Sequence, residues 1–166
     1  MNSKVICKSD ILDMDDRYRR YLMNSVEGIK NAALVGTINS KGITNVAIFN
    51  SVVHIGANPP RIGFIHRPPT VPKQTFENIR ESGEYTINLV TEAMIPAAHQ
   101  TSARYEPGVS EFDQTDLNPE FADGLAAPFV KESPVKFGMR LEEIVPIPCN
   151  GTLLIIGNVE SIRLPE

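Results

Sequence analysis

The sequence predicts a mainly β fold with peripheral helices, arranged as an antiparallel barrel that is closed or nearly closed. About six apolar segments have the length of strands, and turn residues separate most of them. Neighbouring strands joined by short turns are expected to pair as hairpins. Alternating β-α-β units and Gly-rich Rossmann or Walker loops are missing, which argues against a doubly wound nucleotide-binding fold. The chain has 166 residues, so we expect a single domain over 1–166.

The chain is expected to begin with a helical lead-in over residues 1–30. Residues 13–29 carry apolar side chains at roughly helical spacing, and the acidic residues at their start suit the positive end of a helix dipole. Gly28 or Asn31 is expected to end this helix. Strands then follow at 32–38, 44–50, 51–56, 61–66, 85–90, 135–147 and 151–162. The third of these either continues the second strand or bends away from it at Asn50-Ser51.

Two further helices and one long excursion complete the prediction. Thr75 is expected to be the N-cap of a short helix over 76–81. Alanines favour a helix over 92–100 despite Pro96. The rest of 91–134 reads as a long loop with short helical turns, and loops of this length in a domain are usually lids or binding loops.

Composition excludes several classes of function. The net charge is −4 and no basic run is present, so we expect no nucleic-acid partner. No apolar run approaches the roughly 20 residues that span a bilayer, and the first 20 residues lack a secretory signal pattern. We therefore expect no membrane association and a cytoplasmic location. Cys7 and Cys149 are expected to be free thiols, and the three histidines lack the spacing of a zinc site.

The strongest local signal for chemistry is the helix start at Lys73-Gln74-Thr75. The first amides of a helix lack intrahelical acceptors, Thr75 adds a hydroxyl and Lys73 adds a positive charge, which together could seat a phosphate. Arg67 could complete the site with its planar donor fork. The alternative is an ordinary helix start with solvated basic neighbours.

Polar residues within apolar strands are a second signal. Asn45, Asn50 and Ser51 could direct hydrogen bonds at a polar planar ring, or could satisfy backbone groups at bulges and strand ends. His99 and Ser102 lie close together in the excursion, but no G-x-S-x-G elbow accompanies them, which argues against a serine hydrolase.

The ordered set of these motifs resembles the flavin reductase-like family, which has the FMN-binding split-barrel fold and includes flavoredoxin-type proteins. The resemblance runs from 44–47 (TNVA) through Asn58-Pro59-Pro60 to 73–79 (KQTFENI), and includes 99–105 and 109–112. It implies a homodimer that holds FMN, or else FAD, near the subunit boundary. Two departures stand out. Asn50 replaces the first Ser of the family's pair, and the family usually continues beyond 164–166, so we expect the barrel edge or a lid to be incomplete.

Carried onto this sequence, the resemblance assigns the phosphate to Lys73 and Thr75, with Arg67 nearby. The isoalloxazine or ribityl side is assigned to Asn45, Ala47, Asn50 and Ser51. His99 and Ser102 become possible contacts on the nicotinamide side.

The leading hypothesis is an NAD(P)H:flavin oxidoreductase that passes a hydride from nicotinamide C4 to flavin N5. The cofactor supplies the reactivity in such chemistry, so a catalytic triad is not needed. NADH and NADPH remain equal alternatives as the electron donor. A flavoredoxin-like electron-transfer protein is the second hypothesis, and a barrel that binds a non-flavin ligand is the third.

Overall fold

The computed structural model describes residues 3–68, 73–106, 108–122 and 124–166. These residues fall into two units, Met1–Lys30 and Asn31–Glu166. The first unit contains α1 (Lys8–Asp13) and α2 (Asp16–Val26). The helix predicted over 13–29 is confirmed as α2 with shorter bounds, and α1 was not predicted. The helix α2 begins at Asp16 because Asp15 caps it: the Asp15 carboxylate accepts hydrogen bonds from the backbone N–H groups of Arg17 and Tyr18 at 3.0 and 3.1 Å. Among the described residues, no helix combines the length and the apolar character that crossing a bilayer requires.

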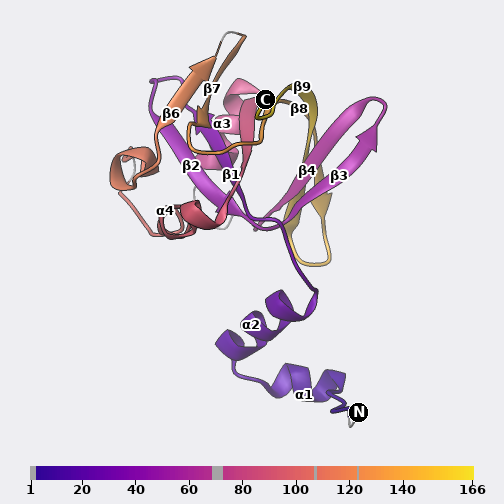
Figure 1. Ribbon diagram of the computed structural model, residues 1–166. Helices are drawn as coiled ribbons and strands as arrows, with labels where there is room; N and C mark the ends of the chain where they lie inside the picture. Colours follow the sequence, from indigo (N-terminus) through magenta and orange to yellow (C-terminus); the bar gives the residue numbers. More distant parts are fainter. Residues whose placement is uncertain (1–2, 69–72, 107, 123) are drawn as a thin grey trace. The chain divides into compact units, whose positions relative to one another are not determined.

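The second unit is built on one antiparallel sheet of seven strands in the order β2-β1-β5-β8-β9-β4-β3. The strands are β1 (Ala33–Ile38), β2 (Thr44–Phe49), β3 (Val52–Ala57), β4 (Pro60–His66), β5 (Glu84–Leu89), β8 (Lys136–Ile147) and β9 (Thr152–Arg163). Figure 1 shows the β1–β2 and β3–β4 pairs at opposite edges of this sheet. The mainly β, antiparallel barrel predicted from the sequence is confirmed.

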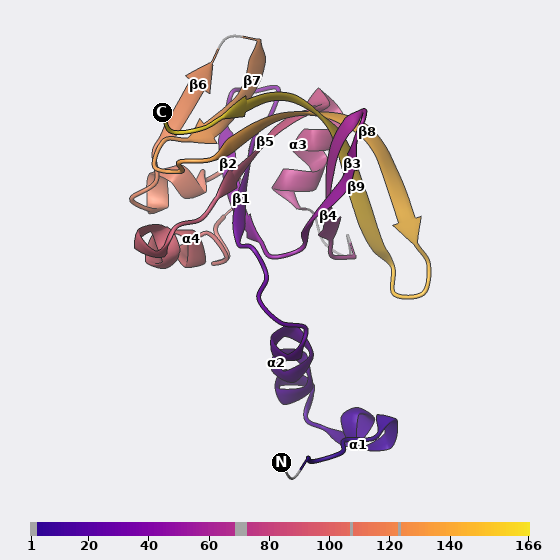
Figure 2. The ribbon, with the colours of Figure 1, turned by 45° about the vertical axis from the view of Figure 1, so that its right-hand side comes forward.

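Of the two alternatives predicted for the segment after β2, the structure has the bend at Asn50-Ser51. Residues 51–56 do not continue that strand, because β3 pairs with β4 at the far edge of the sheet from β2. No ladder joins β2 to β3 within the described part of the chain, so the barrel is split between them. The long β8–β9 hairpin links the two halves, since β8 pairs with β5 and β9 pairs with β4 (Figure 2). The turn of this hairpin contains Asn150-Gly151, with Gly151 at a φ of 71°.

Side chains that alternate along β1 and β2 face two separate cores. The first core lies on the side of α3 (Gln74–Ser82) and contains the buried residues Ala33, Val35, Phe64, Ile79, Tyr85, Ile87, Met139 and Ile155. The second is covered by η1 (Glu92–Met94), α4 (Ile95–Gln100) and η2 (Glu111–Gln114), and contains Leu34, Val46, Met94, Ala98, Phe112, Leu117 and Val130. The β1–β2 ribbon therefore separates α3 from α4.

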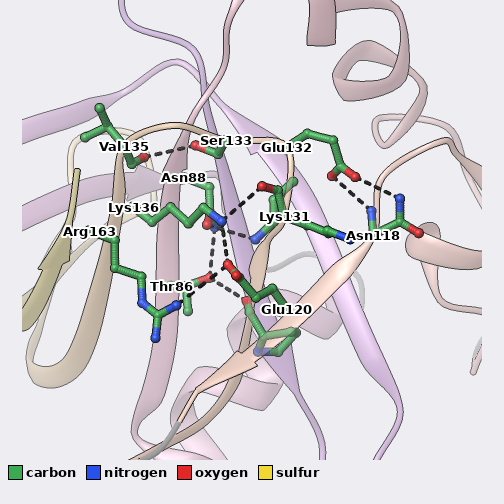
Figure 3. A network of polar contacts seen from close by, with 12 residues as sticks. Thr86, Asn88, Asn118, Glu120, Lys131, Glu132, Ser133, Val135, Lys136 and Arg163 are labelled. Carbon is green, nitrogen blue, oxygen red and sulfur yellow. Dashed lines mark hydrogen bonds and ion pairs between the residues drawn. The ribbon is translucent and has the colours of Figure 1, made fainter. Parts of the chain in front are cut away.

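The excursion predicted over 91–134 contains a β-hairpin that the sequence did not reveal. Strands β6 (Pro119–Ala122) and β7 (Leu125–Val130) pair with each other, and β7 is largely buried. Hydrogen bonds from β5 hold β7: the Thr86 hydroxyl donates to the carbonyl of Pro128 at 2.6 Å, and the Asn88 side chain accepts from the N–H of Val130 at 2.9 Å (Figure 3). Side-chain contacts with another strand, rather than an alternating local pattern, fix this hairpin.

The two short helices predicted in the second unit exist with shifted starts. The helix expected over 92–100 opens with the 3-10 turn η1, and α4 begins at Ile95 with Pro96 in its first turn, where a backbone N–H is not needed. The helix α3 begins at Gln74, so Lys73 and not Thr75 occupies the N-cap position. The predicted Thr75 cap was wrong because its side chain is buried and bonded to another strand, as described below.

Candidate functional site

The first turn of α3 carries exposed positive charge and free backbone donors. Lys73 is exposed, and its side chain makes no capping hydrogen bond. The first helical bond runs from the N–H of Glu77 to the carbonyl of Lys73 at 3.0 Å, so the preceding amides have no acceptor within the helix. A helix start of this kind favours an anion by its dipole as well as by its donors.

The end of β4 brings a second cation to the same place. The ring of His66 lies 5.1 Å from that of Phe76 in the first turn of α3, and Arg67 follows as an exposed residue. His66 is only 4% exposed, and burial, with a smaller effect of the Lys73 charge, lowers the pKa of its imidazole. His66 is therefore neutral near pH 7. Neither Arg67 nor Lys73 belongs to an ion pair formed among the described residues.

Behind this turn, Thr75 is joined to β2 by a buried hydrogen-bonded chain. Thr75 is 5% exposed and Asn45 is 3% exposed. The Thr75 hydroxyl donates to Asn45 Oδ1 at 2.9 Å, and Asn45 Nδ2 donates to Glu111 Oε2 at 3.2 Å and to Gln74 Oε1 at 2.9 Å. This amide orientation is required because the opposite one would set the Asn45 oxygen against two acceptors. The predicted residues Asn45 and Thr75 are thus brought together from positions 30 residues apart.

The third member of this chain, Glu111, was not predicted from the sequence. It belongs to η2, is only 8% exposed, and also accepts a hydrogen bond from the backbone N–H of Val46 at 3.1 Å. Burial raises the pKa of its carboxyl. No local pattern could have revealed this role, because Glu111 lies 65 residues from its partner Val46 in the chain.

The other residues predicted on the flavin-ring side, Ala47, Asn50 and Ser51, lie along β2 and just after its end. Ala47 is half-buried and shares the α3-facing side of β2 with Asn45 and Phe49, because side chains alternate along a strand. Asn50 is exposed at the end of β2. The Ser51 hydroxyl donates to the carbonyl of Ile65 at 3.1 Å and accepts from its N–H at 3.2 Å. Ser51 therefore satisfies backbone at a strand end, which was the structural alternative for this residue.

His99 and Ser102 are not brought together with these residues within one chain. Both are exposed, and the Ser102 hydroxyl donates to the carbonyl of His99 at 2.7 Å at the end of α4. The helix α4 packs through Ala98 on the face of the β1–β2 ribbon opposite α3. The described residues contain no group of three or more His, Cys, Asp or Glu that could hold a metal ion, and Cys7 and Cys149 are exposed free thiols.

Comparison with known protein families identifies the fold that carries this site. A family model described as "Flavin reductase like domain" matches residues 29–166, which includes every strand of the sheet. The chain belongs to the flavin reductase-like family. The resemblance on which the sequence prediction rested is thereby confirmed, and a flavin-related oxidoreductase role follows from membership.

Individual proteins are similar over nearly the whole chain. A protein from Shewanella frigidimarina, described as a candidate flavin reductase with a split barrel domain, is 43% identical, with a TM-score of 0.94 over 99% of this chain and 81% of that one. YwrF, an uncharacterized protein of Bacillus subtilis, is 28% identical over 97% of this chain and 80% of that protein. Nitrilotriacetate monooxygenase component B from Bacillus cereus is 23% identical, with a TM-score of 0.87 over 100% of this chain and 84% of that one, a likeness of fold alone.

Proposed function

We propose that this flavin reductase-like protein binds FMN and transfers a hydride to it from NADH or NADPH. The observation that carries the proposal is the first turn of α3, where exposed Lys73 and Arg67 have no ion-pair partner among the described residues. A helix of nine residues whose first-turn amides have no acceptor within the helix, with two flanking cations, fits a terminal phosphate. FMN, which ends in such a phosphate, would supply the ring that accepts the hydride.

The chain's own residues would bind and orient this cofactor. Lys73, Arg67 and the α3 amides would hold the phosphate, with Thr75 placing the first turn through its bond to Asn45. The ribityl or isoalloxazine side would lie along β2 and its end, beside Asn45, Ala47, Asn50 and Ser51. The Ser51 hydroxyl bonds to the backbone of Ile65, so it would order this edge of the ring site.

The remaining parts of the proposal concern the partner subunit and the electron donor. We propose a homodimer with the flavin near the subunit boundary. His99 and Ser102 would then reach the nicotinamide side from α4, which lies across the β1–β2 ribbon from α3 in its own chain. A cytoplasmic location, where reduced nicotinamide nucleotides are abundant, completes this picture.

Two measurements on the full-length protein test the proposal. Fluorescence titration of FMN into the purified protein should show saturable quenching at one site per chain. Anaerobic stopped-flow mixing of the FMN-loaded protein with NADH or NADPH should then bleach the flavin absorbance rapidly. Flavin binding without bleaching by either nucleotide would favour a flavoredoxin-like electron-transfer role. Absence of flavin binding would favour a barrel for another ligand.

A further inference from the structure

Glu111 is a buried carboxylate to which the proposed function assigns no task. It is 8% exposed, and none of the ion pairs among the described residues includes it. Its partners are neutral donors, the backbone N–H of Val46 at 3.1 Å and the side-chain amide of Asn45 at 3.2 Å. Burying a carboxylate without a cation is unfavourable, and burial raises its pKa accordingly.

The chemistry of the carboxylate fixes the direction of every bond in the chain that leads to α3. An ionised carboxylate only accepts hydrogen bonds, so Asn45 must turn its NH₂ group toward Glu111. The Asn45 oxygen then faces Thr75, and the Thr75 hydroxyl must donate to it. If the Asn45 amide turned round, its oxygen would face Glu111 and Gln74, and its NH₂ group would face the N–H of Val46. Glu111 thus selects one of two arrangements of the residues that support the first turn of α3.

The hydrogen-bonded chain from Glu111 through Asn45 to Thr75 ends at the phosphate end of the proposed flavin site. Thr75 lies in the first turn of α3, next to the N-cap residue Lys73 and the amides without intrahelical acceptors. Glu111 also covers an N–H of β2, which is an edge strand of the sheet. Its carboxylate therefore couples the position of β2 to the position of the α3 amides, and these amides face the proposed phosphate.

We propose that Glu111 is a positioning residue for the phosphate end of the flavin site: through Asn45 it holds Thr75, and with it the first turn of α3, in the arrangement that receives the phosphate. This inference rests on the proposed function and adds to it a residue from the excursion between β5 and β6. Glu111 touches neither cofactor nor substrate in this assignment. Its effect is on phosphate recognition rather than on the hydride-transfer step.

The test compares FMN with riboflavin, which carries the same ring and ribityl chain without the phosphate. Affinities of both flavins would be measured by fluorescence titration for wild type and for the variants E111A, E111D and E111Q. We expect E111A to weaken FMN binding about tenfold, equivalent to about 1.4 kcal/mol, while riboflavin affinity stays within about twofold. E111D, whose carboxylate is withdrawn by one methylene, should show the same selectivity with a smaller loss. E111Q should keep FMN affinity within about threefold, because its amide oxygen can accept both N–H groups.

The outcomes separate the two proposals. Equal loss of FMN and riboflavin binding, or full FMN affinity in E111A and E111D, would overturn the assignment of Glu111 while leaving the flavin site intact. A wild-type protein that binds FMN no better than riboflavin would also overturn it. A wild-type protein that binds neither flavin would overturn the proposed function itself. If thermal unfolding shows that E111A does not fold, the comparison of E111D with E111Q decides the question.

Discussion

Two buried polar clusters of this protein have similar residue types but differ in whether the neighbouring donors and charges have partners within the chain. The first cluster, between β5 and β7, joins Thr86 and Asn88 to backbone groups (Figure 3). Asn88 donates to the carbonyl of Leu34 and to the Thr86 hydroxyl at 3.0 and 2.9 Å, and accepts from the N–H of Val130 at 2.9 Å. Even the nearby cation Lys136 is paired with Glu120. Every polar atom named in this cluster has its partner within the chain.

The second cluster, Asn45, Thr75 and Glu111, is equally buried but ends at the start of α3. There the backbone amides have no intrahelical acceptor, and Lys73 and Arg67 have no ion-pair partner among the described residues. Buried polar side chains alone therefore do not indicate a ligand site in this fold. A site is indicated where such a cluster supports donors and charges that the chain itself does not satisfy.

The largest effect is expected from a substitution at Asn88, in the cluster between β5 and β7. Replacing Asn88 by Ala should lower the free energy of unfolding by about 3 kcal/mol, because the N–H of Val130 loses its acceptor, and the carbonyl of Leu34 and the Thr86 hydroxyl each lose a donor, in a fully buried place. Urea unfolding at constant pH measures this loss. The exposed residue Asn150, replaced by Ala, serves as the matched control and should change stability by less than about 1 kcal/mol. Similar losses in the two variants would show that the closed cluster does not hold β7.

Gly36 tests the same cluster by overpacking. A Cβ at Gly36 would lie 2.2 Å from the carbonyl oxygen of Pro128 and 2.6 Å from the Thr86 hydroxyl, so Gly36→Ala must push β7 away from β1. We expect a loss of about 2–3 kcal/mol in the free energy of unfolding. Gly56→Ala is the matched control, because its nearest neighbour is the carbonyl oxygen of Pro59 at an ordinary 3.5 Å. An unchanged urea midpoint in Gly36→Ala would contradict the close packing of β7 on the sheet.

A substitution at Lys73, beside the second cluster, should change ligand affinity without changing stability. Lys73→Ala should weaken FMN binding by about 1–2 kcal/mol through the loss of charge-assisted bonds to the phosphate, while the urea midpoint stays unchanged. Fluorescence titration measures the affinity. Lys41, an exposed lysine in the turn between β1 and β2, provides the control substitution to Ala. Equal FMN affinities of the Lys73 and Lys41 variants would remove Lys73 from the site.

The smallest expected effect is a pH dependence that belongs to Glu111. Its folded-state pKa is raised by burial, so the folded protein binds this proton more tightly than the unfolded chain does. The associated stability is fully present below the unfolded value near 4.5 and is lost as pH rises through the raised pKa. In Glu111→Gln this loss is absent, so the variant should gain stability relative to wild type as pH rises from 4 to 7. A stability difference between the two proteins that does not change with pH would contradict a raised pKa.

The closed cluster also shows where sequence reasoning failed. Residues 119–130 contain Ala-Ala-Pro and a Gly turn instead of an alternating pattern, so they were expected to be loop and helical turns. They form the hairpin β6–β7 instead, and hydrogen bonds from Thr86 and Asn88 hold β7 in place. The same limit applies to Thr75. Its residue type predicts an N-cap, but Thr75 is the second residue of α3, two positions beyond the N-cap, where its side chain is buried against Asn45, 30 residues away in the chain.

The sequence by itself determined the strands of the seven-stranded sheet, several of its turns and the family, because alternating apolar residues, Asn-Gly and Pro signals and ordered motifs act over a few neighbouring positions. It also indicated Lys73, Asn45 and Thr75 as candidate site residues. Only the tertiary structure decided that β2 and β3 lie at opposite edges of the barrel, that the Ser51 hydroxyl serves the backbone, and that Glu111 completes the support of α3. These features depend on which residues far apart in the chain form hydrogen bonds with each other. Local sequence patterns do not predict such partners.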